Sequence, residues 1–155
     1  MTSLDQLNDD FKDLLRCLSS EGVEFLIVGA YALAYHGLPR ATGDIDILVR
    51  PTPENAPRVH RALSEFGAPL ASSGLSEADW TSEDMVYQIG VPPRRVDILT
   101  GISGVSFDAA WEGRASADLE GYTVSFIGRE ALILNKRSTG RLKDMADVES
   151  LEKQD

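Results

Sequence analysis

The feature that most constrains this chain is a short apolar run that ends in glycine and precedes a second run opened by two aspartates. The residues Phe25-Leu26-Ile27-Val28 are apolar and partly β-branched, which predicts a buried strand. Gly29 ends this run, and the apolar segment 30–35 before His36-Gly37 predicts a short helix. A second strand is expected over 44–49, so the chain should pass from strand to helix at Gly29 and then back into the sheet.

Asp44 and Asp46 open the second strand, and because side chains alternate across a strand they are expected to share one face. Carboxylates held a few ångströms apart repel by roughly 4 kcal/mol at the effective dielectric of a protein surface. A divalent cation converts that cost into affinity, and Mg²⁺ prefers one or two carboxylates together with substrate phosphates. Gly29 would let backbone amides approach a phosphate. Although an Asp-X-Asp pair alone is more often a solvated strand edge, the combination predicts a metal-nucleotide site.

A third carboxylate, Asp97, lies in the strand-like segment Arg94-Arg95-Val96-Asp97-Ile98-Leu99. An aspartate inside an apolar strand is unfavourable unless it has a partner or a cation. We therefore predict that Asp97 joins Asp44 and Asp46 at the metal. The alternative is an exposed strand position at which Asp97 pairs with Arg94 or Arg95.

Together these segments resemble the nucleotidyltransferase superfamily with the DNA polymerase β-like fold. That family has an apolar residue, Gly, then Gly or Ser, a spacer, acid-apolar-acid, and a third acid on a later strand. The matching segments are Val28-Gly29-Ala30, Asp44-Ile45-Asp46 and Val96-Asp97-Ile98. Segments 36–46 and 134–147 resemble the small bacterial branch that includes the AbiEii-type toxin nucleotidyltransferases, and the resemblance covers roughly residues 22 to 152.

The resemblance implies an α+β fold, with a mixed β-sheet flanked by helices, in a single domain over 1–155. It implies Mg²⁺-dependent transfer of a nucleoside monophosphate from a nucleoside triphosphate to an acceptor hydroxyl, with release of pyrophosphate. Mn²⁺ is an alternative ion. The implied catalytic metal ligands are Asp44, Asp46 and Asp97, and the implied nucleotide-binding residues are Gly29, Ala30, Arg40 and Lys136. The acceptor stays open between an RNA end, a protein hydroxyl and a small molecule, and a toxin role would add a protein partner or antitoxin.

Ala30 departs from the family pattern, because alanine retains the backbone N–H but lacks the hydroxyl that a serine would offer to the phosphates. The alternative is therefore a catalytically degenerate relative that binds nucleotide or a protein partner without turnover. Lys136 is equally consistent with a solvated helix lysine, and Arg40 with a counter-charge for Asp44. Asp144 and Asp147 are expected to orient Lys136 or Arg141, or to complement a helix dipole, and His36 to close its helix.

Composition limits the other functions. The net charge of −10 opposes broad binding to nucleic acid, which needs clustered Lys and Arg. With 155 residues, 43% of them hydrophobic, the chain can bury a core without disulfide or metal staples, and Cys17 is expected to be a small packed residue. No run approaches the roughly 20 apolar residues of a membrane span, and the N-terminus is unlike a signal peptide. A cytoplasmic protein without a membrane partner is expected.

The remaining elements follow from periodicity and turn residues. A helix is expected over 3–20 with a capping box at Ser3 and Gln6, and another from Pro53, capped by Thr52, to about Phe66. Segment 67–80 is expected to be a loop or broken helix. Strands are expected over 84–90 and 94–99, and a second hairpin over 115–119 and 122–127. Two helices over 129–137 and 141–152 should be separated at Gly140. Trp80 and Trp111 are expected to serve in packing.

Overall fold

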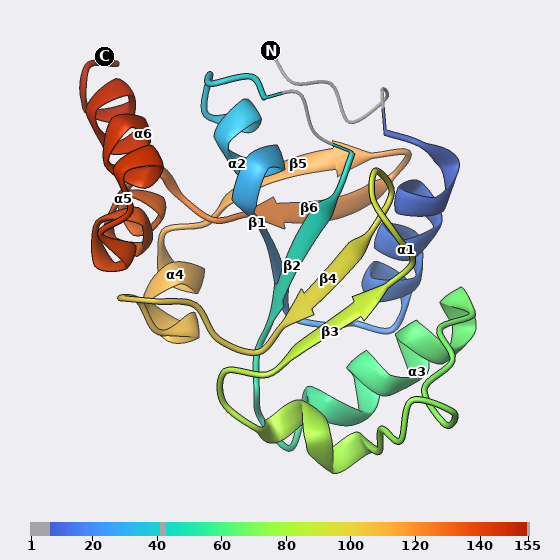
Figure 1. The fold of residues 1–155 in the computed structure, drawn as a ribbon. Helices are drawn as coiled ribbons and strands as arrows, with labels where there is room; N and C mark the ends of the chain where they lie inside the picture. Colours follow the sequence, from blue (N-terminus) through green and yellow to red (C-terminus); the bar gives the residue numbers. More distant parts are fainter. Residues whose placement is uncertain (1–6, 41–42, 155) are drawn as a thin grey trace.

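One mixed sheet with strand order β3-β4-β2-β1-β6-β5 forms the centre of the molecule (Figure 1). The computed structural model describes residues 7–40 and 43–154. The strands are β1 (Phe25–Val28), β2 (Ile45–Val49), β3 (Val86–Ile89), β4 (Val96–Leu99), β5 (Ala115–Leu119) and β6 (Tyr122–Phe126). The helices are α1 (Asp9–Ser20), α2 (Gly29–Tyr35), α3 (Ala56–Phe66), the 3₁₀ helix η2 (Glu77–Thr81), α4 (Phe107–Glu112), α5 (Arg129–Thr139) and α6 (Leu142–Glu152).

Strand β2 lies between β1 and β4 and fixes how the first half of the chain meets the second. It runs antiparallel to β1 and parallel to β4. The hairpins β3–β4 and β5–β6 extend the sheet at either edge, and β6 joins β1 in parallel. This mixture of directions confirms the predicted α+β fold with a mixed sheet flanked by helices.

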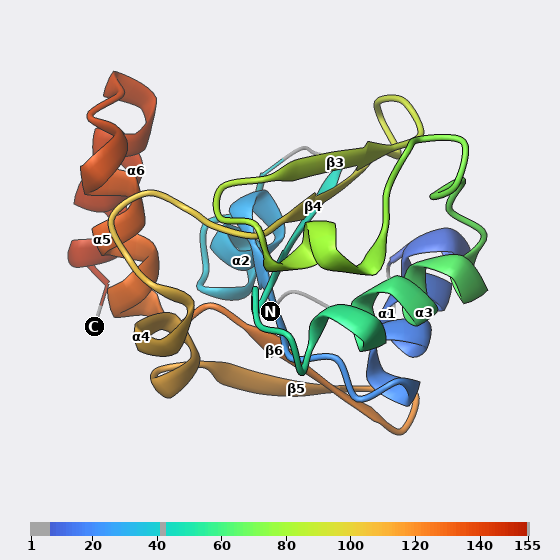
Figure 2. The ribbon, with the colours of Figure 1, turned by 90° about the horizontal axis from the view of Figure 1, so that it is seen from below.

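Helices cover the two faces of the sheet differently (Figure 2). Helices α1 and α3 pack against each other on one face, whereas α5 and α6 stand on the other side. Ile45, Ile47 and Ile98 are fully buried, and they alternate along their strands with the aspartates at 46 and 97. One face of β2 and β4 is therefore apolar core, and the opposite face is free to carry charge.

Two predicted helices begin later than expected. Helix α1 starts at Asp9, where the Asn8 side chain accepts a hydrogen bond from Phe11 N (2.9 Å), and neither Leu7 nor Asn8 is helical. The predicted capping box at Ser3 and Gln6 lies outside the described residues, as do residues 41 and 42 of the quoted motif. The predicted range 3–20 was therefore too long at its N-terminal end.

Helix α3 starts at Ala56 rather than Pro53, because Asn55 holds two strand ends together. Its buried side chain accepts from Glu24 N (2.9 Å) and donates to the carbonyls of Glu24 (3.1 Å) and Arg50 (3.0 Å). The residues that precede it form a turn from Thr52, whose carbonyl accepts from Asn55 N. Thr52 Oγ1 also accepts from Asn55 N (3.3 Å), so Thr52 caps this turn, and the regular helix begins only at Ala56.

The later elements agree with the sequence more closely. The second hairpin and the helix pair are confirmed, and Gly140 separates α5 from α6 with a left-handed φ of 67°. The loop over 67–80 contains the start of η2, and α4, capped by Ser106, was not predicted. Trp80 is fully buried and donates to His60 Nδ1 (3.1 Å), which confirms a packing role. Over the described ranges, no helix combines the length and apolarity needed to cross a bilayer.

Candidate active site

The strand register brings two of the predicted acids to adjacent positions. Asp46 in β2 is the Cα partner of Asp97 in the parallel strand β4, and of Val28 in the antiparallel strand β1. Paired positions in neighbouring strands project to the same face of a sheet. The carboxylates of Asp46 and Asp97 therefore stand side by side, next to the point at which β1 passes into α2.

Gly29 makes room for the Asp46 carboxylate. It follows Val28 directly and has a left-handed φ of 69°. A Cβ atom at this position would overlap Asp46 Oδ2. Only glycine satisfies both the backbone angle and the close approach, so the predicted glycine and Asp46 belong to one structural unit.

Asp44 lies just before β2 and is directed toward Arg95. Its Oδ1 accepts from Arg95 N (3.0 Å), and its Oδ2 lies 3.7 Å from Arg95 Nη2. Gly43 presses against the neighbouring turn so closely that a Cβ there would overlap the Pro93 carbonyl oxygen. The carboxylate of Asp44 is therefore fixed against the start of β4.

Arg95 also binds Asp97 through both arms of its guanidinium. Nε donates to Asp97 Oδ1 (2.8 Å) and Nη2 donates to Asp97 Oδ2 (3.3 Å). The alternative pairing of Asp97 with Arg95 is thus present, but the strand position is buried and not exposed. Residues 95 and 97 fall on one face of a strand, and this spacing is the signal in the sequence for the contact.

Burial, together with the neighbouring acid Asp97, raises the pKa of Asp46 to about 6. Burial is the largest cause, followed by the charge of Asp97 and the hydrogen bond with it, while the Arg95 charge acts in the opposite direction. Across residues 7–40 and 43–154, no group of three or more Asp, Glu, His or Cys side chains is gathered closely enough to hold a metal ion. The Asp46–Asp97 pair matches a hard divalent cation in charge and donor type. The assignment of Asp44, Asp46 and Asp97 as metal ligands stays a prediction.

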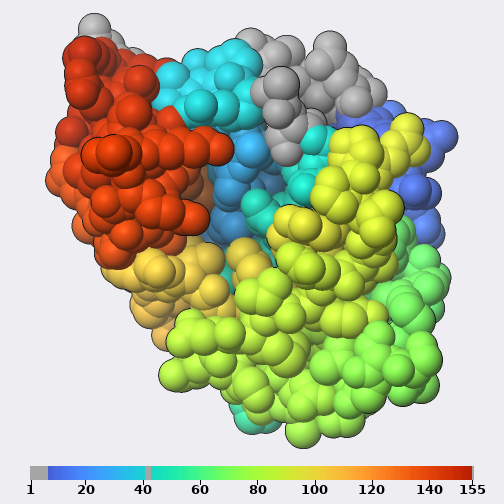
Figure 3. Space-filling model, in the orientation of Figure 1, coloured from blue at the N-terminus to red at the C-terminus, as the bar shows by residue number. Residues whose placement is uncertain are grey.

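The remaining predicted residues meet in a pocket of about 540 Å³ beside Asp46. In the space-filling view, α2 and β2 lie at the bottom of a hollow between α5–α6 and β3–β4 (Figure 3). The pocket is lined by Gly29, Ala30, Leu33, Arg40, Asp46, Lys136, Arg141, Lys143, Asp144 and Asp147. The structure therefore places all four predicted nucleotide-binding residues around the same space as Asp46. Arg141 and Lys143 complete it, although neither was predicted to bind nucleotide.

Lys136 is held in place by two buried acids of α6. Its Nζ donates to Asp144 Oδ1 (3.1 Å) and lies 3.1 Å from Asp147 Oδ2, outside hydrogen-bond geometry for the latter. Burial opposes ionisation of Asp144, but hydrogen bonds from Thr139 and Lys136 outweigh it, so the pKa of Asp144 is lowered. Arg40 pairs with Asp147, and a pairing with Asp44 was the alternative expected from sequence. Lys136 is thus a buried, ion-paired side chain and not a solvated one.

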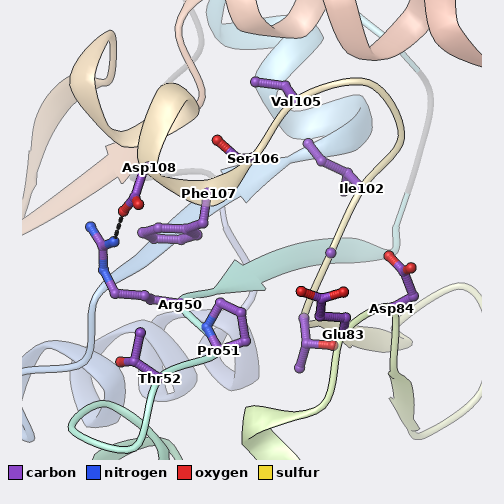
Figure 4. Close-up of a pocket in the computed structure, with 12 residues that line it drawn as sticks. Arg50, Pro51, Thr52, Glu83, Asp84, Ile102, Val105, Ser106, Phe107 and Asp108 are labelled. Carbon is purple, nitrogen blue, oxygen red and sulfur yellow. Dashed lines mark hydrogen bonds and ion pairs between the residues drawn. The ribbon is translucent and has the colours of Figure 1, made fainter.

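A second pocket of about 350 Å³ lies at the other end of β2 and β4 (Figure 4). Arg50 crosses it, pairs with Glu24 and Asp108, and stacks over the Phe107 ring at 4.5 Å. The residues lining it in the described chain include none of the predicted site residues. The residues predicted to bind nucleotide line the pocket beside Asp46 and not this second pocket. His36 plays a structural part, as its Nε2 donates to the Ile127 carbonyl (2.7 Å).

Comparison with known proteins places this geometry in a recognised fold. Neither a known family profile nor a curated protein sequence matches the chain. A candidate nucleotidyltransferase from Thermotoga maritima aligns over 96% of this chain and 94% of its own, with 18% identity and a TM-score of 0.54. The lincosamide antibiotic adenylyltransferase LnuA, in its lincomycin-bound structure, aligns over 95% of this chain and 98% of its own, with 13% identity and a TM-score of 0.51.

An antigenic nucleotidyltransferase-like protein from Paracoccidioides brasiliensis aligns over 94% of this chain and 77% of its own, with 16% identity and a TM-score of 0.51. At these identities the likeness concerns the fold. The chain has a single-domain nucleotidyltransferase fold, as the motif resemblance implied.

The raised pKa of Asp46 predicts how stability varies with pH without metal. The unfolded carboxyl titrates near pH 3.9, so between about pH 4 and 6 the folded state binds more protons and its stability falls as pH rises. Asp46→Asn removes this cost and should raise the free energy of unfolding at pH 8 by on the order of 1 kcal/mol. The gain should vanish near pH 4. Urea unfolding in EDTA measures the gain in unfolding free energy, and Asp10→Asn, at an exposed position, is the control. A gain that does not vary with pH would contradict the raised pKa of Asp46.

The burial of Lys136 predicts a large structural effect at that position. Lys136→Ala leaves the carboxylates of Asp144 and Asp147 buried with fewer partners, and it should cost about 3–5 kcal/mol of unfolding free energy. Lys143 is exposed on the same pocket wall, and its change to alanine should lower the free energy of unfolding by less than about 0.5 kcal/mol. Denaturant unfolding of both variants compares them. Equal effects would show that the ion pairs of Lys136 contribute nothing to the fold.

Proposed function

We propose that this chain is a metal-dependent nucleotidyltransferase, which moves a nucleoside monophosphate from a nucleoside triphosphate to an acceptor hydroxyl. The proposal rests mainly on the pairing of Asp46 with Asp97 in adjacent parallel strands. Gly29 lies beside them, and its lack of a side chain makes room for the Asp46 carboxylate. The nucleotidyltransferase fold of the structural neighbours supports the same reaction class. The reactions named for these neighbours belong to those proteins, and only the fold is shared with this chain.

Each acid of the site has a separate role in the proposed reaction. Asp46 and Asp97 would hold Mg²⁺, or Mn²⁺ in its place, with Asp44 as a further ligand. The ion would supply charge neutralisation to the triphosphate and to the attacking and leaving oxygens. The acceptor oxygen forms a bond to the α-phosphorus, the bond to the β-phosphate oxygen breaks, and pyrophosphate leaves. Asp97 accepts the proton of the acceptor hydroxyl.

The pocket beside Asp46 suits the triphosphate in size and charge. Its volume of about 540 Å³ lies within the range of ligand sites, and Arg40 and Lys136 both line it, each paired with Asp147. The backbone at Gly29 and Ala30 approaches the phosphates without a side chain larger than a methyl group. Asp144 and Asp147 fix Lys136 so that its position is set before nucleotide arrives.

A second candidate function is a nucleotide-binding or protein-binding module that keeps the fold and lacks turnover. Ala30 favours it because the phosphate-contacting hydroxyl is missing, and so does the engagement of Asp44 and Asp97 by Arg95. Such a module would bind nucleotide with metal and transfer nothing.

The acceptor and the biological role are proposed from resemblance. A small-molecule hydroxyl is one acceptor class, since the neighbour LnuA is an antibiotic adenylyltransferase, and an RNA end or a protein hydroxyl are the others. The motifs around 36–46 and 134–147 support the AbiEii-type branch, and with it a toxin role and an antitoxin or other protein partner. A cytoplasmic location fits each of these roles.

The direct test is calorimetric titration with each of the four nucleoside triphosphates, with and without Mg²⁺. At least one triphosphate should bind in a metal-dependent way. Asp46→Asn should weaken that binding at least about tenfold, which corresponds to about 1.4 kcal/mol. Asp10→Asn changes the charge equally on the exposed surface of α1 and should bind as the wild type does.

Transfer of an α-phosphate label to an RNA, protein or small-molecule acceptor then separates the two candidates. Label transfer that Asp46→Asn abolishes supports the enzyme, and binding without transfer supports the non-catalytic module. Metal-dependent binding of equal strength in Asp46→Asn would remove Asp46 from the site.

A further inference from the structure

Arg95 stands where a cation is needed among the acids of the site. Its guanidinium makes two hydrogen bonds with Asp97, at 2.8 and 3.3 Å, and its Nη2 lies 3.7 Å from Asp44 Oδ2. Its charge also lowers the electrostatic cost of ionising Asp46. One guanidinium thus acts on all three carboxylates that the proposed function assigns to the metal.

Three of the four cations that line the pocket beside Asp46 are paired with acids of α6, and the fourth, Lys143, is exposed on α6. Lys136 pairs with Asp144 and Asp147, Arg40 with Asp147, and Arg141 with Asp144. These pairs belong to the α5–α6 wall and not to the strands. Neutralisation at the ends of β2 and β4 therefore depends strongly on Arg95.

We propose that Arg95 is a resident counter-cation of the carboxylate site and competes with the divalent metal for Asp97 and Asp44. This inference rests on the proposed function, because it takes these acids as the metal ligands. The guanidinium engages each oxygen of Asp97 with one hydrogen bond and holds a positive charge beside them, so it repels a divalent ion that binds there and is expected to be displaced. Without metal, the guanidinium offsets part of the negative charge of the site, and metal binding is weaker than the three acids alone would give.

The geometry allows the guanidinium to leave. The side chain of Arg95 is 30% exposed, whereas that of Asp97 is 12% exposed. Arg95 can therefore turn outward to solvent while the strand position of Asp97 is unchanged. The hydrogen bond from Arg95 N to Asp44 comes from the backbone, so it does not require the guanidinium.

The proposal is tested by measuring the affinity for Mn²⁺, both by calorimetry and from the electron paramagnetic resonance signal of the free ion. Arg95→Gln should bind Mn²⁺ about tenfold more tightly than Arg94→Gln, since a charge-assisted hydrogen-bond pair no longer has to be broken. Arg94 is the matched control because it is exposed, adjacent and equal in charge. Arg95→Lys keeps the charge without the planar fork and should lie between the two.

A double variant, Arg95→Gln with Asp46→Asn, shows where the ion binds. The gain in affinity should disappear in it if the ion binds at the strand acids. In EDTA, Arg95→Gln should also melt at a lower temperature than Arg94→Gln, and Mn²⁺ should remove the difference. If Arg95→Gln does not fold, Arg95→Lys against Arg94→Lys gives the same comparison.

The failures of the two proposals differ. Equal Mn²⁺ affinity in Arg95→Gln and Arg94→Gln, with binding lost in Asp46→Asn, would overturn the role of Arg95 and leave the metal site intact. A lack of Mn²⁺ binding at millimolar concentration in the wild type and in every variant would overturn the metal site itself, and the role of Arg95 with it.

Discussion

The site depends on the repulsion between two carboxylates that the sheet holds side by side. Asp46 and Asp97 are paired positions on adjacent parallel strands, and the opposite face of both strands is fully buried. Neither strand can move away without opening that core. The repulsion favours a counter-charge or a proton at the pair: Arg95 binds Asp97, and burial together with the charge of Asp97 raises the pKa of Asp46 to about 6.

The surrounding elements supply the space and the positive charge that the Asp46–Asp97 pair lacks. Gly29 admits the Asp46 carboxylate at the turn from β1 into α2, and Gly43 brings Asp44 against the start of β4. On the facing wall, α5 and α6 bury Lys136 between Asp144 and Asp147. Asp46 lines the same pocket as the basic side chains of this wall, an arrangement suited to a ligand that carries phosphates and a metal.

Local patterns in the sequence were sufficient to predict much of the fold and much of the arrangement of the site. The apolar run 25–28, Gly29 and the acids at 44, 46 and 97 predicted the strand–glycine–helix–strand order because each depends on neighbours in sequence. The start of α3 was misplaced because Asn55 satisfies backbone groups of Arg50 and of Glu24, which is distant in sequence, and α1 begins where Asn8 caps it. The orientation of Asp44 and the partner of Arg40 depend on tertiary contacts, which no periodicity encodes.

A crystal structure with Mn²⁺ and a non-hydrolysable nucleoside triphosphate, using the anomalous signal of the metal, tests the proposed site most directly. We expect Mn²⁺ between the carboxylates of Asp46 and Asp97, with phosphates beside Gly29 and Lys136. Mn²⁺ bound away from these strands, or a nucleotide seated in the Arg50 pocket, would contradict it.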